Sequence, residues 1–300
     1  MTAALARLEG SPMDFLLKIR NDLVAEIPAG SAKYAIQYTS GWFVVWVEGR
    51  DEIVDAAVER ARAELGSSQK LLLHRSIGAP TLHDRVIVAT TQTPLTGTEF
   101  AQWVMHMRDV GTSMEPAQIW GRLGAPCLID QKLGTPPRHQ FAVIAADDHG
   151  PVDQLRRLSE RFRSPIVYQR FGVAQMRMPD MGTAYVDLPG DDGAARVRVL
   201  SGRAMERASV RNAMPQVEAL VVIVGKRPLA MAELARNIAK AADRAGHVPQ
   251  LWLAGPGGEP SHACSRVLGD HGIQTRSIAT VEGGGNLLAL LSGAGLHVTL

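Results

Sequence analysis

Residues Tyr34 to Gly49 read YAIQYTSGWFVVWVEG, and this stretch decides the fold of the first part of the chain. Two runs rich in β-branched and aromatic residues, Tyr34 to Tyr38 and Trp42 to Val47, are separated by Thr39-Ser40-Gly41. Runs of this composition favour strands, and a short glycine-containing link favours a tight connection. The stretch therefore predicts a β-hairpin.

Helical patterns flank the hairpin on both sides. Apolar residues recur at helical spacing from Met13 to Val24, and Asp51 can cap a second helix that runs to about Leu65. Short apolar runs at Leu71 to Leu73 and Arg85 to Ala89 supply two more strands. The order helix, strand, strand, helix, strand, strand predicts a ferredoxin-like α+β layer with both helices on one face.

The hairpin and its surroundings resemble the BLUF domain, the blue-light sensor that uses FAD. The resemblance rests on Gly41 to Gly49 with Tyr38 three residues ahead of the glycine, and on the strand around Asp84 to Ile87. With the helical segments that follow, it implies a BLUF-like domain over residues 1–123. The alternative is that the glycine, phenylalanine and glutamate of this stretch mark only a hairpin.

The same resemblance implies that the flavin chemistry has been lost. The family's photochemical glutamine falls on Val45, and its flavin-contacting asparagine falls near Gly30. A valine side chain has no hydrogen-bond donor or acceptor, and glycine has no side chain at all. We therefore expect the fold without a flavin, and no cofactor in its place.

A stretch rich in proline and glycine, Gly124 to Arg138, predicts a domain boundary. After it, the order strand, helix, strand, strand over residues 139–190 predicts a second ferredoxin-like unit. Met176 and Met178 are of a type that suits a cuprous ion. Alternating methionines also fit one face of a strand, so we expect no metal site.

Strands alternate with helices through residues 194–300. The strands are Arg196 to Leu200, Ala219 to Val224, Gln250 to Ala254 and Gln274 to Ile278. This alternation predicts a parallel, Rossmann-like or flavodoxin-like α/β domain. The segment faintly resembles cobalamin-binding and receiver domains but lacks the Asp-x-His-x-x-Gly element of the former and the phosphoacceptor aspartate of the latter.

Ligands of parallel sheets bind beyond the carboxyl ends of the strands. Glycines there permit close approach, and helix N-termini with nearby cations can receive an anion. Neither GxGxxG nor GxxxxGK[ST] is present, and the alternative is that these glycines only turn the chain. The candidate binding residues are Ser201, Gly202, Arg203, Gly225, Lys226, Arg227, Gly255, Gly257 and Gly258.

The composition limits the partners and the location. Lys and Arg number 32 against 30 Asp and Glu, a formal net charge of +2, which is too balanced to hold nucleic acid by electrostatics alone. The two cysteines, Cys127 and Cys264, are far apart in sequence and suggest neither a disulfide framework nor a zinc site. No signal-peptide pattern and no apolar run of membrane-spanning length occur, so we expect a cytoplasmic protein.

No catalytic residues are predicted, because GxSxG, HExxH and kinase-type loops do not occur in the sequence. An enzyme stays open, since active-site partners meet in space rather than in sequence. We expect a non-catalytic regulatory or scaffolding protein that acts through protein–protein interaction, with a homodimer as one arrangement. The alternative is an enzyme or small-molecule sensor that binds a phosphorylated or nucleotide ligand at the loops of the third segment.

Overall fold

The chain is a mixed α/β protein in which two compact units can be distinguished. The computed structural model describes residues 1–5, 8, 10–28, 30–64, 70–82, 84–128, 137–145, 151–172, 181–190, 193–202, 217–245, 248–255, 257–278 and 287–296. Unit 1 takes in residues 1–126, 132–135 and 167–181, and unit 2 takes in residues 127–131, 136–166 and 182–300.

Unit 1 contains the predicted helices and strands and one further strand. Its strands are β1 (Thr2–Leu5), β2 (Ala32–Thr39), β3 (Trp42–Gly49), β4 (Lys70–Leu72), β5 (Val86–Gln92) and, from its second residue on, β7 (Ile166–Gly172). Its helices are α1 (Pro12–Glu26), α2 (Asp51–Glu64), α3 (Gly97–Val110) and α4 (Pro116–Gly124), with a 3₁₀ turn at Gly111–Ser113. Strand β1 corrects the predicted order; its four residues are too few to show an alternating pattern.

The strands of unit 1 lie in the order β7-β5-β2-β3-β1-β4. From β2 to β4 all neighbours pair antiparallel, whereas β5 runs parallel to β2 and antiparallel to β7. The predicted hairpin is confirmed, since Thr39 pairs with Trp42. Ser40 and Gly41 between them both have positive φ, as a two-residue type I′ turn requires.

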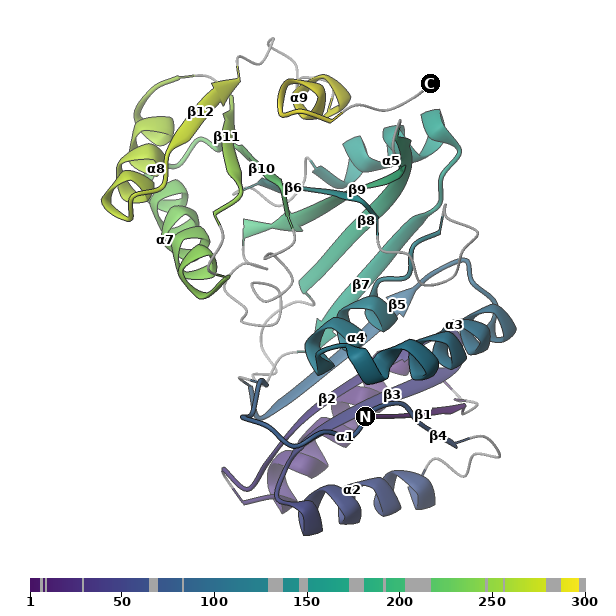
Figure 1. The fold of residues 1–300 in the computed structure, drawn as a ribbon. Coiled ribbons are helices and arrows are strands. Elements are labelled where there is room, and N and C mark those ends of the chain that lie inside the picture. Colours follow the sequence, from purple (N-terminus) through teal and green to yellow (C-terminus); the bar gives the residue numbers. More distant parts are fainter. Residues whose placement is uncertain are drawn as a thin grey trace. The chain divides into compact units, whose positions relative to one another are not determined.

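Helices cover both faces of this sheet (Figure 1). On one face, α1 and α2 pack over a core that includes Leu16 and Phe43. On the opposite face, α3 and α4 pack over Trp42 through Phe100 and Ile119. Trp42 and Phe43 are neighbours in β3 and point to opposite faces, which is the alternation of a strand that is buried on both sides.

Gly172 in β7 sets how closely α1 approaches the sheet. A Cβ at Gly172 would lie 2.3 Å from Val88 Cγ2 and 2.9 Å from Leu17 Cδ2, so a larger residue would push α1 away. A helix about 10 Å across covers about two strands that are spaced about 4.8 Å apart. With α1 against β5 and β2 and α2 against β3, this layer leaves β1 and β4 uncovered.

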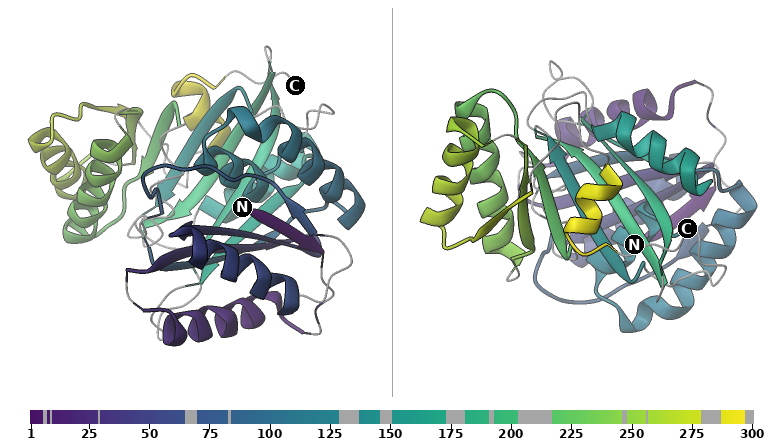
Figure 2. Two further views of the ribbon diagram at one scale, coloured as in Figure 1. Left: turned by 60° about the horizontal axis from the view of Figure 1, so that its bottom comes forward. Right: turned by 90° about the horizontal axis from the view of Figure 1, so that it is seen from above.

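Unit 2 is built around parallel strands. Its strands are β6 (His139–Ala145), β8 (Met181–Gly190), β9 (Gly193–Ser201), β10 (Ala219–Ile223), β11 (Gln250–Ala254) and β12 (Thr275–Ile278), and its helices are α5 (Pro151–Phe162), α7 (Pro228–Ala245), α8 (Glu259–Asp270) and α9 (Leu287–Gly293). The order is β12-β11-β10-β6-β9-β8, in which β8 alone of these runs antiparallel to its neighbour. Helices α7 and α8 pack together, and α9 lies apart from them beside α5 (Figure 2).

The segment 139–190, predicted as one βαββ unit, contributes to both sheets. Strand β6 pairs in parallel with β9 and β10, and β8 pairs with β9, whereas β7 pairs with β5 of unit 1. Residues Phe141 to Ala145 of β6 are all buried. A continuous apolar run of this kind is typical of a central parallel strand that is covered on both faces.

A buried ion pair joins β8 to β9 in unit 2. Arg196 donates to Asp187 through Nε at 2.7 Å and Nη2 at 2.9 Å, and its guanidinium lies 3.9 Å from the centre of the Tyr185 ring. The backbone N–H of Leu128 also donates to Asp187, at 3.1 Å. Burial alone would lower the pKa of Arg196, but Asp187 and Tyr185 hold it above the ordinary value. Burial and the charge of Arg196 lower the pKa of Arg198 to about 10.

We expect Asp187→Ala to lower the free energy of unfolding by about 3–5 kcal/mol, because it leaves a buried guanidinium without its counter-charge. Guanidinium chloride unfolding followed by circular dichroism measures the loss. The control is Asp153→Ala, which breaks a largely exposed ion pair with Arg156 and should cost less than about 1 kcal/mol. Equal losses in the two variants would contradict a stabilising role for the buried pair.

Candidate functional site

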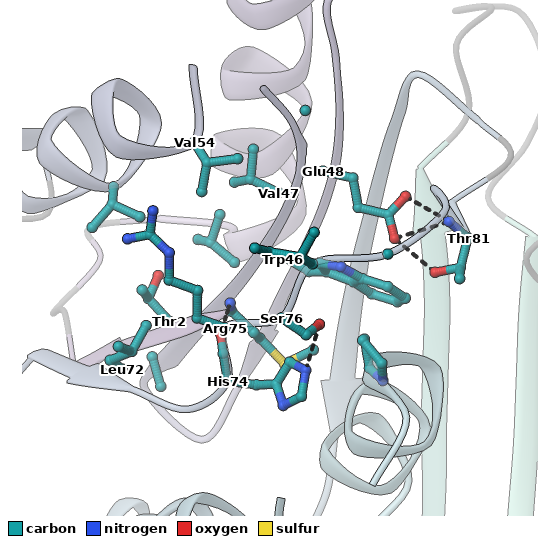
Figure 3. Close-up of a pocket in the computed structure, with 18 of the residues that line it drawn as sticks. Thr2, Trp46, Val47, Glu48, Val54, Leu72, His74, Arg75, Ser76 and Thr81 are labelled. Carbon is teal, nitrogen blue, oxygen red and sulfur yellow. Dashed lines mark hydrogen bonds between the residues drawn. The ribbon is translucent and has the colours of Figure 1, made fainter. Parts of the chain in front are cut away.

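A cavity of about 950 Å³ lies in unit 1 beside the strands that α1 leaves uncovered (Figure 3). We call it the α2–β4 groove, because α2 forms one side and strands β3, β1 and β4 form the floor. The loop after β4 and the turn before α4 close its ends. Its volume is in the range that holds small-molecule ligands.

The walls of the groove are mainly apolar. Val45 and Val47 project from one face of β3, and Val54 and Val58 project from α2. Leu72 of β4 lies in the same lining and is 56% exposed, which is unusual for a leucine in a strand. The exposed leucine follows from the missing helix above β4. These walls offer apolar surface that a bound molecule could cover.

Glu48, at the end of β3, holds the loop that closes one end of the groove. Its carboxylate accepts hydrogen bonds from the backbone N–H of Thr81 at 2.9 Å, the hydroxyl of Thr81 at 2.6 Å and the N–H of Leu82 at 2.8 Å (Figure 3). Carboxylates bond strongly to neutral donors in this geometry. The loop is therefore anchored to the sheet by one side chain.

Arg75 links the other side of the loop to α2. Its guanidinium donates to Asp55 at 3.0 Å and lies 3.6 Å from Asp51. All three side chains are more than half exposed, so the pairs are screened by water. They orient the loop relative to the first turns of α2 rather than stabilise the fold strongly.

His74 is also engaged on both ring nitrogens. Nδ1 lies 3.2 Å from the carbonyl oxygen of Gly111, and Nε2 lies 2.9 Å from the hydroxyl of Ser76. The backbone carbonyl of His74 accepts from the amine of Met1 at 2.6 Å. Burial and the nearby charge of Arg75 lower the pKa of that amine to about 6. These polar groups hold the groove together through bonds to one another.

The residues predicted as a binding site in unit 2 lie at one edge of its sheet. The last residues of β9, β6, β10 and β11 are register partners, so the loops after these strands begin side by side. This edge carries Ser201 and Gly202 at the end of β9, and Gly225, Lys226 and Arg227 after β10. The side chains of Lys226 and Arg227 are exposed.

Two of the predicted glycines have a local structural role. Gly255 has a φ of +155°, and a Cβ there would lie 2.8 Å from Cβ of Val224. Gly258 is the N-cap of α8 with a φ of +135°, whereas Gly257 borders open space. Arg203 lies outside the described residues. Backbone geometry thus accounts for Gly255 and Gly258 without a ligand.

The sequence did not identify the α2–β4 groove. Its valines alternate as expected of a buried strand, and which strands lack a helical cover depends on the packing of α1. One signal was available: Ile77, in the loop Ser76-Ile77-Gly78-Ala79-Pro80, is 99% exposed. A large apolar residue in a loop of small residues is a mark of an apolar surface site.

No protein-family model matches the chain, and no curated protein is significantly similar to it in sequence. Within the described residues, no three or more His, Cys, Asp or Glu side chains are grouped so as to hold a metal ion. In the same part of the chain, no helix has both the length and the apolar character needed to cross a membrane.

We expect Glu48→Ala to lower the free energy of unfolding of unit 1 by about 2 kcal/mol, because three donors lose a charged acceptor. The loop over residues 73–82 should also become the first site of limited trypsin cleavage, at Arg75. Denaturant unfolding and mass spectrometry of the fragments measure the two effects. Asp22→Ala, on the exposed side of α1, is the control, and a Glu48→Ala protein that matches it would contradict the anchor.

Proposed function

We propose that the protein is a non-catalytic regulatory protein whose unit 1 binds an apolar ligand in the α2–β4 groove and signals occupancy to a protein partner. The observation that carries the proposal is the groove itself. It has ligand size, apolar walls and an exposed leucine in its floor. Its polar side chains already bond to one another, which suits binding better than reaction.

The topology of unit 1 supports a ferredoxin-like module of BLUF-like kind. The order β1, α1, β2, β3, α2, β4 with antiparallel neighbours β4-β1-β3-β2 is that of a βαββαβ layer, extended by β5. Val45, which falls on the photochemical glutamine of the BLUF resemblance, lines the groove, whereas Gly30 does not. An apolar residue at that position supports a ligand other than flavin.

Filling the groove should abolish binding of an apolar reporter. Val54→Trp places an indole between α2 and β3, and we expect it to weaken Nile red binding about tenfold or more, because the dye and the indole compete for the same volume. The control is Val24→Trp, on α1 outside the groove, where the valine is 41% exposed. Nile red fluorescence in titrations of the full chain measures both affinities.

Unchanged Nile red affinity in Val54→Trp, with the fold intact by circular dichroism, would remove the groove as the binding site. A flavin absorption band in the purified protein would contradict the flavin-free assignment. Binding lost in both tryptophan variants would point to a general surface effect and would also count against the proposal.

A phosphorylated or nucleotide ligand at unit 2 is a second candidate function. The parallel strands β9-β6-β10-β11-β12 follow the order 2-1-3-4-5 when numbered along the chain, which supports a flavodoxin-like domain. In such sheets the ligand lies where the strand order reverses, here between β6 and β10. Gly225, Lys226 and Arg227 follow β10 directly.

This second candidate predicts that ADP raises the melting temperature of the protein and that Lys226→Ala removes the rise, because a ligand selective for the folded state stabilises it. Lys240→Ala, on an exposed position of α7, should keep the full rise. Differential scanning fluorimetry gives the comparison. An equal rise in both variants would exclude Lys226 from an anion site.

A further inference from the structure

The side chains around the α2–β4 groove carry an excess of negative charge. Its lining includes five carboxylates and one guanidinium; these are Glu48, Asp51, Asp55, Glu59, Glu115 and Arg75. Glu59 has further interactions, and the argument holds without it. The remaining four carboxylates outnumber the guanidinium by three charges.

The partners of these carboxylates leave the excess in place. Arg75 is shared between Asp51 and Asp55, so one positive charge faces two negative ones. Glu48 bonds only to neutral donors of Thr81 and Leu82, which stabilise its charge without cancelling it. Glu115 caps the first turn of α4, again through a neutral backbone N–H.

The acidic and apolar parts of the groove occupy the same cavity. Asp51 and Asp55 lie one turn of α2 apart, on the helix that also presents Val54 and Val58 to the groove. Glu48 immediately follows Val47 in β3. A molecule seated on the valines therefore has carboxylates within reach at either end.

We propose that the α2–β4 groove binds a small amphipathic cation, with an alkyl or aryl body and an ammonium or guanidinium head. The inference rests on the proposed function and names its ligand class. The apolar body covers the valines, Leu72 and Ile77, which are otherwise exposed or half-buried in the lining. The positive head lies among the carboxylates, where an anionic head would be repelled.

Three eight-carbon probes that differ only in head group test this ligand class. Octylammonium chloride, 1-octanol and sodium octanoate are compared at pH 7 and low salt for displacement of Nile red from the full chain. We expect octylammonium to displace the dye at about tenfold lower concentration than octanoate, with octanol between them, and the difference to shrink as salt is added.

Charge variants show whether the groove carboxylates cause the preference. Asp51→Asn together with Glu115→Gln should bring octylammonium close to octanol and leave octanol itself unchanged. Asp22→Asn, an exposed acid of α1 outside the lining, should leave the tenfold preference intact. A preference that survives in the double variant would overturn the assignment to these carboxylates.

The outcomes separate the two proposals. Equal displacement by the three probes, or stronger displacement by octanoate, would overturn the cationic ligand while the groove remained a binding site. Nile red that binds equally well to Val54→Trp would instead overturn the groove itself, whatever the order of the probes.

Discussion

The width of the unit 1 sheet limits what its two helices can cover. Six strands span more than the breadth of α1 and α2, and the close contact of α1 at Gly172 commits that helix to the β5 side. Helix α2 then packs against β3, so the outer strands β1 and β4 have no helix above them. The α2–β4 groove, its exposed Leu72 and the room for a ligand all follow from this mismatch.

Polar side chains turn this uncovered strip into a defined site. Glu48 fixes one end of the closing loop through Thr81 and Leu82, and Arg75 fixes the other part of the loop to α2. Each contact uses the hydrogen-bonding capacity of a charged group but leaves negative charge on the groove. The groove therefore combines apolar walls with an acidic border, and this pairing favours an amphipathic cation over a neutral or anionic molecule.

Much of the local structure could be predicted from the sequence, because it depends on short-range patterns. The hairpin at Tyr34 to Gly49 and helix α2 follow from strand composition, a positive-φ turn and helical spacing. Long-range pairing could not be predicted in this way. The partners of β6 lie in β9 and β10, and nothing in its own apolar run distinguishes them from nearer strands.

The site was harder to predict than the fold for the same reason. The loops after β9 and β10 were nominated from a general rule about parallel sheets, whereas the groove depends on where α1 comes to rest. The contact of Asp187 with Arg196 likewise depends on the register of β8 and β9. Only Ile77, a bulky residue among small ones, marks the groove region in the sequence itself.

The most direct test of the account is a methyl NMR titration of the full chain with 1-octanol, with isoleucine, leucine and valine methyl groups labelled. The groove predicts saturable shifts that are largest at Val45, Val54 and Leu72, with Val221 and Leu253 of unit 2 unchanged. Shifts that are absent at the groove, or largest in unit 2, would contradict the claim that this uncovered part of the sheet is a binding site.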